Sequence, residues 1–223
     1  MKITVFNGSP SGENSATAVM ANAFLEGAAE AGAETEQVFL IDEHIEYCRG
    51  CFSCWFATPG KCVHQDGMGE LLKKYMESDV VVFGTPVFTW DMTAVMKNFV
   101  DRLIALKSPV MTQKNGHMDM EDAMPKQQKF AVMSNCGFPG EHNFDVIKEV
   151  FKSCEPCLEI YRNCGKLLKS KNEAVQGIVA EYLKAVKQAG FEMADDGEVS
   201  AETLEALNKP LMSIGEYAKF LGM

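Results

Sequence analysis

Four cysteines fall in one short stretch of the chain, at Cys48, Cys51, Cys54 and Cys62. Three thiols at successive Cys-x2 spacing with a fourth nearby can hold one cubane 4Fe–4S cluster. Zinc more often takes two separated Cys-x2-Cys pairs, which makes a zinc site the second interpretation. Free or redox-active thiols are the third. The spacing therefore indicates metal or thiol chemistry and leaves these three alternatives open.

A second motif lies near the N-terminus, where the apolar run Ile3–Phe6 precedes the loop Asn7-Gly-Ser-Pro-Ser-Gly-Glu-Asn-Ser-Ala-Thr17. Such a loop presents backbone N–H groups and hydroxyls to an anion at the positive end of a helix. It contains no Lys or Arg, and the Walker and Gly-x-Gly-x-x-Gly patterns are absent. This combination indicates a tightly bound cofactor monophosphate, for which FMN is the natural candidate. An ordinary strand-to-helix turn with Ser15 as N-cap is the simpler alternative.

Two later loops have a composition that suits the ring of such a cofactor. The first, Gly84–Met92, joins a rigid proline to two aromatic side chains and a methionine. A flavin is a flat, partly apolar plate, so backbone groups near Val87 and the faces of Phe88 or Trp90 could frame it. The second, Ser134–Gly140, is a sharp turn that can bring N–H groups to a ring edge.

The elements that must position these loops alternate along the chain between strands and helices. Strands are predicted at Ile3–Phe6, Thr35–Leu40, Asp79–Gly84, Lys129–Ser134 and Leu158–Tyr161. Helices are predicted at Ser15–Ala31, Glu70–Glu77, Thr93–Leu106, Phe144–Phe151 and Glu173–Ala189, the last closed by Gly190. This alternation predicts an α/β, flavodoxin-like, doubly wound five-stranded parallel sheet, with the ligand at the carboxyl ends of the strands.

Two segments exceed that minimal fold. The Cys-rich loop 42–66 is an insertion after the second strand, and residues 195–223 form a C-terminal extension with helices near Ala201–Leu207 and Met212–Leu221. We therefore expect a flavodoxin-like domain over residues 1–194 and a helical extension over 195–223. The Met-rich stretch Ser108–Lys126 is predicted to be a loop at the substrate entrance.

Composition narrows the possible partners. The chain has 223 residues, 47% of them hydrophobic, with a net charge of −10 and a pI of about 4.9. This acidity argues against nucleic acid and anionic membranes as partners. No stretch approaches the roughly 18 apolar residues of a membrane span, and the N-terminal apolar run is too short for a signal peptide. We expect a cytoplasmic protein, in which eight cysteines favour metal or redox use over disulfides.

The chain resembles the NAD(P)H-dependent FMN reductase family of flavodoxin-like proteins, within the branch that includes the iron–sulfur flavoproteins. The segments that carry the resemblance are GSPSGENSAT at 8–17, CRGCFSCWFATPGKC at 48–62, QDGM at 65–68, GTPVFTWDMTAVMKNFVDRL at 84–103 and NCGFPG at 135–140. The resemblance implies FMN, with its phosphate on Ser9, Ser11, Asn14, Ser15 and Thr17 and its ring against Pro86, Val87, Phe88 and the 135–139 turn. It also implies a homodimer or homotetramer with the flavin near a subunit interface.

The complete set of residues expected at the cofactor is Ser9, Ser11, Asn14, Ser15, Ala16, Thr17, Thr85, Pro86, Val87, Phe88, Trp90, Asn135, Cys136, Gly137 and Phe138. The first functional hypothesis is an oxidoreductase that passes electrons from NAD(P)H through FMN to a quinone, an aromatic or another small acceptor. No side chain need act as acid or base, because the cofactor carries the chemistry. The second is an iron–sulfur flavoprotein relaying electrons from a ferredoxin-like donor through a 4Fe–4S cluster and FMN. The third is a non-catalytic redox sensor that uses the 48–62 thiols.

Overall fold

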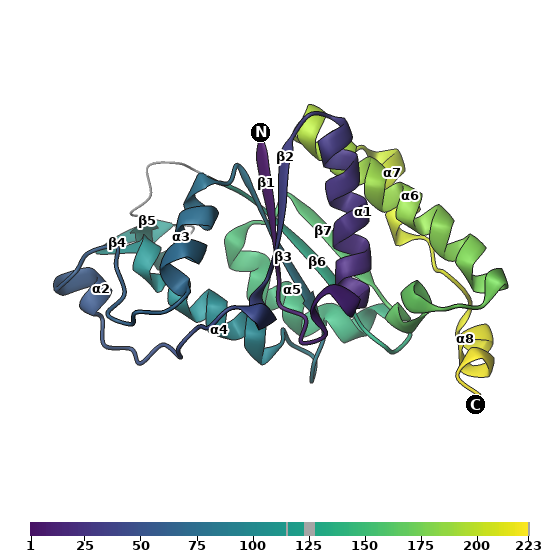
Figure 1. The fold of residues 1–223 in the computed structure, drawn as a ribbon, viewed down its shortest axis with the longest axis horizontal. Coiled ribbons are helices and arrows are strands. Elements are labelled where there is room, and N and C mark those ends of the chain that lie inside the picture. Colours follow the sequence, from purple (N-terminus) through teal and green to yellow (C-terminus); the bar gives the residue numbers. More distant parts are fainter. Residues whose placement is uncertain (115, 123–127, 223) are drawn as a thin grey trace.

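A central sheet of five parallel strands organises the protein, seen in a computed structural model that describes residues 1–114, 116–122 and 128–222. The strand order is β2-β1-β3-β6-β7 (Figure 1), which is the flavodoxin-like order that the sequence predicts. The strands are β1 Lys2–Asn7, β2 Glu34–Phe39, β3 Val80–Pro86, β6 Lys129–Asn135 and β7 Leu158–Arg162.

Helices cover both faces of this sheet. One face carries α1 (Ala16–Glu30) and α6 (Glu173–Asp195). The other carries α3 (Met68–Glu77), α4 (Ala94–Arg102) and α5 (Asp145–Phe151). Buried strands that face helices on both sides read as continuous apolar runs, which is why Val80–Phe83 shows no polar alternation.

The side-chain alternation of β1 divides the interior into two cores. Ile3 and Val5 point into the core beneath α1 and α6, while Phe6 points into the core beneath α3 and α4. There its ring stacks on that of Phe99, with the two centroids 4.6 Å apart. The strand therefore holds its carboxyl end, where the loop 8–15 begins, firmly between two packed layers.

The sequence-based end of α6 was wrong. Gly190 does not close this helix, which continues to Asp195. Instead Gly190 lies where α6 crosses α1, and a Cβ there would stand 1.9 Å from the carbonyl oxygen of Phe24. Gly27 of α1 makes the reciprocal approach, to the carbonyl oxygen of Lys187 at 1.8 Å. The glycines allow the two helix backbones to come into direct contact.

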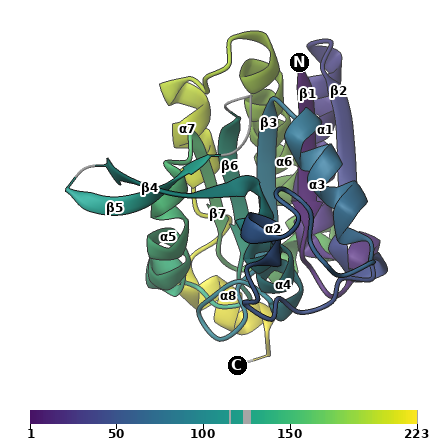
Figure 2. The ribbon, with the colours of Figure 1, turned by 90° about the vertical axis from the view of Figure 1, so that its left-hand side faces the viewer.

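The stretch predicted as a loop at the substrate entrance is also different. Residues Lys107–Lys114 and His117–Asp122 form an antiparallel pair, β4 and β5, that extends away from the main sheet (Figure 2). Its residues Val110, Met111 and Met118 are exposed. The second strand, HMDMED, does alternate between polar and apolar residues, but Pro109 stands inside the first strand, and a proline in a run argues against a strand. The preceding helix ends at Arg102, and Leu103–Leu106 forms a 3-10 turn.

The two segments beyond the minimal fold are both ordered into elements. The Cys-rich loop contains a short helix, α2 (Ser53–Phe56), and the C-terminal extension contains α7 (Ala201–Asn208) and α8 (Ile214–Phe220), as predicted. Leu207, Leu211 and Tyr217 of the extension are buried in the same core as α1 and α6. Among the described residues, none of the helices has the length and apolar character needed to traverse a membrane.

Candidate functional site

The loop after β1 leaves backbone donors unpaired at the start of α1. Ser15 is the N-cap, and its hydroxyl accepts a hydrogen bond from the amide of Ala18 (2.9 Å) while donating one to the carbonyl of Gly12 (2.7 Å). The amides of Ala16 and Thr17 are the first two of the helix and have no acceptor within it. These N–H groups, at the positive end of a 15-residue helix, can bind an anion. The hydroxyl of Ser15 is occupied by the cap.

Asn7, at the end of β1, adds a buried donor to this loop. Its side-chain oxygen accepts a hydrogen bond from the amide of Ser9 at 2.9 Å, which bends the chain out of the strand. Its amide nitrogen is buried and has no partner among the described residues. Ser9 is buried as well, whereas Ser11 and Asn14 are exposed at the rim of the loop. A buried N–H without a partner costs free energy, so this position favours an acceptor from outside the chain.

The loop after β3 is a tight reversal that displays two aromatic side chains. Phe88 and Asp91 pair through their backbones, N to O at 2.9 and 3.1 Å. Thr89 and Trp90 between them both have positive φ, +50° and +67°. Two adjacent non-glycine residues in this region store conformational strain, which is common at binding sites. The reversal leaves Phe88 54% and Trp90 59% exposed, so both rings are open to a ligand.

The loop after β6 is held from one side by the loop after β7. The amide of Cys136 donates to the carbonyl of Arg162 (3.0 Å), and the amide of Gly165 donates to the carbonyl of Cys136 (2.7 Å). Cys136 is buried, and its thiol donates to the carbonyl of Phe138. The ring of Phe138 is 72% exposed beside it. The turn therefore presents an aromatic ring on a rigid backbone.

Hydrogen bonds connect these three loops to one another. The hydroxyl of Thr93, the N-cap of α4, donates to the carbonyl of Gly8 (2.5 Å). The amide of Val87 donates to the carbonyl of Asn135 (2.8 Å), and the side-chain amide of Asn135 donates to the hydroxyl of Thr17 (2.8 Å). Residues predicted at the phosphate and at the ring thus come together at the carboxyl edge of the sheet. Buried Thr85 supports the centre, where its hydroxyl accepts from the amide of Thr93.

Burial sets the protonation of the cysteine in this site. It raises the pKa of the Cys136 thiol to about 11, and the hydrogen bond with Phe138 only partly offsets that effect. Cys136 is therefore a neutral thiol at physiological pH. Such a thiol is a poor nucleophile, which favours a packing role in the turn over covalent chemistry.

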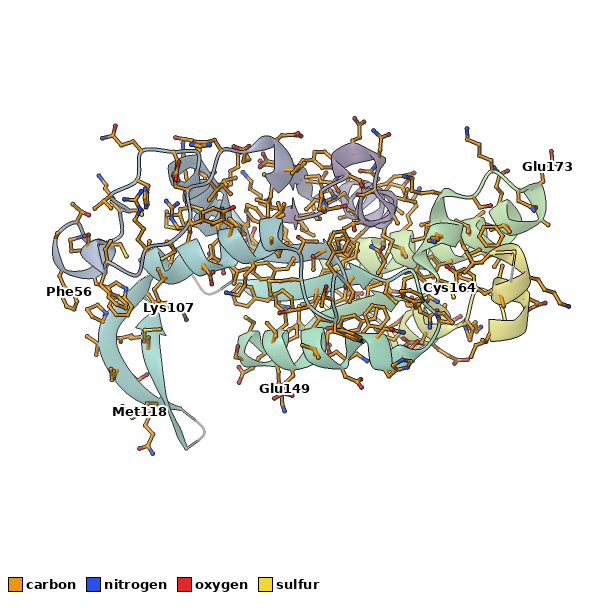
Figure 3. All side chains as sticks on the ribbon, turned by 90° about the horizontal axis from the view of Figure 1, so that it is seen from below. Phe56, Lys107, Met118, Glu149, Cys164 and Glu173 are labelled. Atoms are coloured by element: carbon orange, nitrogen blue, oxygen red, sulfur yellow. The ribbon has the colours of Figure 1, made fainter. Side chains whose placement is uncertain are left out.

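The Cys-rich loop is fastened to α4, the helix that follows the loop after β3, and to the 3-10 turn at its end. The indole N–H of Trp55 donates a hydrogen bond to the carbonyl of Ile104 (3.0 Å). The side-chain amide of Asn98 donates one to the backbone carbonyl of Ile45 (2.7 Å). At this end of the molecule Phe56 lies near Lys107, far from Cys164 (Figure 3). A structural connection therefore runs from the cysteine loop to the candidate site along α4.

A buried ion pair completes this attachment. The guanidinium of Arg102 on α4 binds both carboxylate oxygens of Asp66, at 2.8 and 3.2 Å, and each side chain is 1% exposed. Burial alone would raise the pKa of Asp66, but bonds from Arg102 and from the amides of Glu46 and Met68 hold it below its usual value. Arg102 also donates to the carbonyl of Glu46. Asp101, the neighbour of Arg102 in the sequence, binds Lys97 on the surface.

The four thiols of the loop lie in different environments. Cys48 and Cys51 are exposed, Cys54 is buried and Cys62 is half-buried. Burial, followed by the charge of Cys62 and then of Cys51 and Cys48, raises the pKa of Cys54, so the thiols influence one another. Yet within the described part of the chain no three His, Cys, Asp or Glu side chains gather closely enough to hold a metal ion. Cysteine thiolates are donors that bind iron or zinc. The positions of these four thiols in the structure, however, do not form a site for either metal.

These environments predict an order of thiol reactivity. Hydrogen bonds from the side chain and backbone of Ser53 lower the pKa of exposed Cys51, whereas burial raises the pKa of Cys136 and Cys164. Because the thiolate is the reacting species, iodoacetamide at pH 7.5 should modify Cys51 well before Cys136 or Cys164. Peptide mass spectrometry over a time course measures this order. Early labelling of Cys136 would show that its turn is open.

Some residues that build the site were missed in the sequence. Asn7 begins the first loop and Thr93 begins a predicted helix, but neither side chain was assigned a role; a threonine before an apolar helical run is an N-cap signal that could have indicated the role of Thr93. The partner of Arg102 lies on a different segment, and Tyr217 reaches the site from the C-terminal extension. Neither contact leaves a local pattern.

The N-terminal half of the chain is similar in sequence to known proteins. The family model described as NADPH-dependent FMN reductase matches residues 1–120. An iron–sulfur flavoprotein of Archaeoglobus fulgidus is 38% identical over 104 residues, covering 47% of this chain and 46% of that protein. The chain spans about half the length of the curated relatives it matches.

Solved structures share the fold at low sequence identity. An FMN-dependent NADH-azoreductase from Bacillus anthracis, in complex with FMN, has a TM-score of 0.62 at 15% identity and covers 87% of this chain and 100% of its own. An NAD(P)H:quinone oxidoreductase from Methanothermobacter marburgensis has a TM-score of 0.62 at 15% identity, covering 86% and 96%. Since the family model accounts for more than half of the sequence, the chain belongs to the NADPH-dependent FMN reductase family.

Proposed function

We propose that the protein binds FMN where the three loops meet and passes electrons from NAD(P)H through it to a small acceptor. The observation that carries this proposal is the hydrogen-bonded connection of the loops after β1, β3 and β6 through Thr17, Thr93 and Asn135. It joins an anion-binding helix start to a set of exposed aromatic rings. Family membership and the azo- and quinone-reductase names of the structural neighbours support the same function.

In this proposal the phosphate lies at the N-terminus of α1. The amides of Ala16 and Thr17 donate to it, and the side-chain amide of Asn7 is a buried donor close by in the chain. Ser9, Ser11, Asn14 and Ser15 line the loop, with Ser15 acting through the helix cap. Helix dipole and backbone donors can hold a monophosphate without a lysine.

The ring lies against the other two loops. Backbone groups of Pro86, Val87 and Gly137 face its edge, and the exposed rings of Phe88, Trp90 and Phe138 supply apolar surface. Bound FMN supplies a hydride acceptor that can also transfer single electrons. The chain's contribution is to bind and orient: tight hydrogen bonds between the loops keep the phosphate and ring subsites at a fixed separation, and neutral Cys136 keeps the turn free of charge.

A second candidate function is electron relay from a ferredoxin-like donor through an iron–sulfur cluster to FMN. The four thiols on a loop fastened to α4, together with relatives named iron–sulfur flavoproteins, favour it. The loop 48–62 would have to rearrange to gather its thiols around iron. Anaerobic purification followed by iron and zinc analysis decides between the candidates: about four irons per chain support the relay, and metal-free protein supports the simple reductase.

Ala16→Pro tests the phosphate site. Proline is tolerated at the first position of a helix, and Ser15 already has the extended backbone (ψ 156°) that a following proline needs. The substitution removes one phosphate-facing N–H. Losing a hydrogen bond to a charged group weakens FMN binding by about 10- to 100-fold. Flavin fluorescence titration of the FMN-free variant measures this change.

Ala201→Pro is the matched control, because it places proline at the same position of α7 after a similarly extended Ser200 (ψ 153°). It should leave FMN affinity unchanged. Equal affinities for wild type and Ala16→Pro would refute the phosphate assignment. Stopped-flow reduction by NADH and by NADPH, followed by reoxidation with a quinone or azo dye, then tests the reaction itself.

A further inference from the structure

One buried tyrosine attaches the last helix to the protein. Of the seven residues of α8, only Tyr217 is buried, at 1% exposure. Ser213 and Glu216 form a capping box at the start of the helix, so its first turn is stabilised locally. α8 lies at the end of the molecule where the parallel strands terminate (Figures 1 and 2). Its docking therefore depends mainly on where the Tyr217 side chain goes.

That side chain reaches the turn assigned to the flavin ring. The hydroxyl of Tyr217 donates to the carbonyl of Gly137 at 2.6 Å. Burial raises the pKa of Tyr217 to about 12, so the hydroxyl keeps its proton and remains a donor at physiological pH. The C-terminal extension thus ends on a backbone atom within the candidate site.

Arg162 supports the approach of the extension. Its guanidinium lies over the ring of Tyr182, 4.1 Å from the centroid, and donates to the carbonyls of Leu207 and Lys209 at the end of α7. Its own carbonyl accepts from the amide of Cys136. One residue therefore connects the turn after β6 to the segment that leads into α8. The turn is held by β7 on one side and by Tyr217 on another.

The bond from Tyr217 fixes the orientation of one peptide group. A trans peptide is planar, and its C=O and N–H point in opposite directions. Because the carbonyl of Gly137 faces Tyr217, the amide of Phe138 points away from α8. This amide donates to no other group in the described part of the chain. Its N–H is therefore available to a ligand beside the exposed Phe138 ring.

We propose that Tyr217 is a positioning residue that holds the Gly137–Phe138 peptide with its N–H toward the flavin ring, and thereby couples FMN binding to the docking of α8. This inference rests on the proposed function. A fixed N–H donor at the ring stabilises the negative charge of reduced flavin. Removing the hydroxyl should make the flavin midpoint potential more negative and weaken FMN binding by about 3- to 10-fold, the range of one neutral hydrogen bond.

The variant for the test is Tyr217→Phe, which keeps the buried ring and removes only the hydroxyl. Tyr75→Phe is the matched control, because it makes the same change on α3, in the other core. Both full-length proteins are prepared without FMN and then loaded with it. Hydrogen–deuterium exchange with mass spectrometry compares each protein with and without FMN in the segments 9–17, 135–140 and 213–221. Redox titration of the loaded proteins supplies the midpoint potentials.

The coupling predicts that FMN slows exchange in all three segments of the wild type and of Tyr75→Phe. In Tyr217→Phe, the protection of 213–221 should disappear while that of 9–17 remains, and only this variant should shift in potential. If FMN protects 9–17 but never 213–221, or if Tyr217→Phe behaves as the wild type, the role of Tyr217 is refuted and the FMN site stands. If FMN protects neither segment, the proposed function itself fails.

Discussion

Replacing Arg102 by methionine is expected to lower the free energy of unfolding by about 3–5 kcal/mol, because the buried carboxylate of Asp66 loses its guanidinium partner. Both side chains are 1% exposed, so water cannot take the place of the missing cation. Asp66 and Arg102 also hold the backbone at Glu46 and at Met68, the start of α3, by hydrogen bonds. The backbone at both places should become more mobile in the variant. Urea unfolding at pH 7, followed by far-ultraviolet circular dichroism, measures the loss.

The same helix supplies the control. Lys97 and Asp101 form an exposed pair on α4, so Asp101→Asn should change stability by about 1 kcal/mol or less. The double variant Arg102→Met with Asp66→Leu should recover much of the loss, since no charge is then left buried. An Arg102→Met protein as stable as Asp101→Asn would show that the pair does not hold the cysteine loop.

The pair also gives stability a defined pH dependence. The folded-state pKa of Asp66 lies below the unfolded value of about 3.9. Its contribution is therefore complete above pH 4 and is lost as the pH falls through the folded pKa. The stability difference between wild type and Arg102→Met should shrink when unfolding is repeated at progressively lower pH from 7, first because the unpaired Asp66 of the variant takes up a proton and then because the ion pair of the wild type is lost. A difference independent of pH would mean that the guanidinium acts through packing alone.

Gly190→Ala is expected to be strongly destabilising for the addition of a single methyl group, as is the reciprocal change Gly27→Ala. The new Cβ would stand 1.9 Å from the carbonyl oxygen of Phe24, so α6 must move off α1. Overpacking of this kind costs about 3 kcal/mol, toward the upper end of the usual range. Thermal and urea unfolding measure the effect.

Gly177→Ala, in the same helix, is expected to raise the free energy of unfolding instead. Nothing lies within 4 Å of the position its Cβ would take, and the residue is exposed. Alanine has a higher helix propensity than glycine, so this change should stabilise the protein by about 0.5–1 kcal/mol. Equal effects at Gly177 and Gly190 would show that α1 and α6 do not meet as closely as described.

These cases show what the sequence could predict. Continuous apolar runs such as Val80–Phe83 and amphipathic helices identify the strands and helices well, because burial on both faces of a strand leaves a clear pattern. Gly190 was misread because a glycine near a helix end carries the same signal whether it stops the helix or lets another backbone approach. The hairpin β4–β5 was missed because Pro109 stands within its first strand, where a proline argues against a strand.

The candidate site likewise has a part that the sequence predicts and a part that it does not. The three loops were predicted together, because carboxyl ends of parallel strands share one edge of the sheet. The bonds that connect them, such as Thr93 to Gly8, join segments distant in sequence and follow only from the packed structure. The pairing of Arg102 with Asp66 and the contact of Tyr217 with Gly137 are of the same kind. Long-range polar contacts depend on three-dimensional position and leave no periodic signal.

Titration of the FMN-free protein with FMN and with riboflavin, followed by flavin fluorescence, tests the central claim most directly. The two ligands share the ring and differ only in the phosphate, which we assign to the N-terminus of α1. The account predicts one FMN per chain and riboflavin binding that is weaker by at least about 100-fold, since the phosphate accepts several charge-assisted hydrogen bonds. Equal affinity for the two ligands, or no binding of FMN, would contradict it.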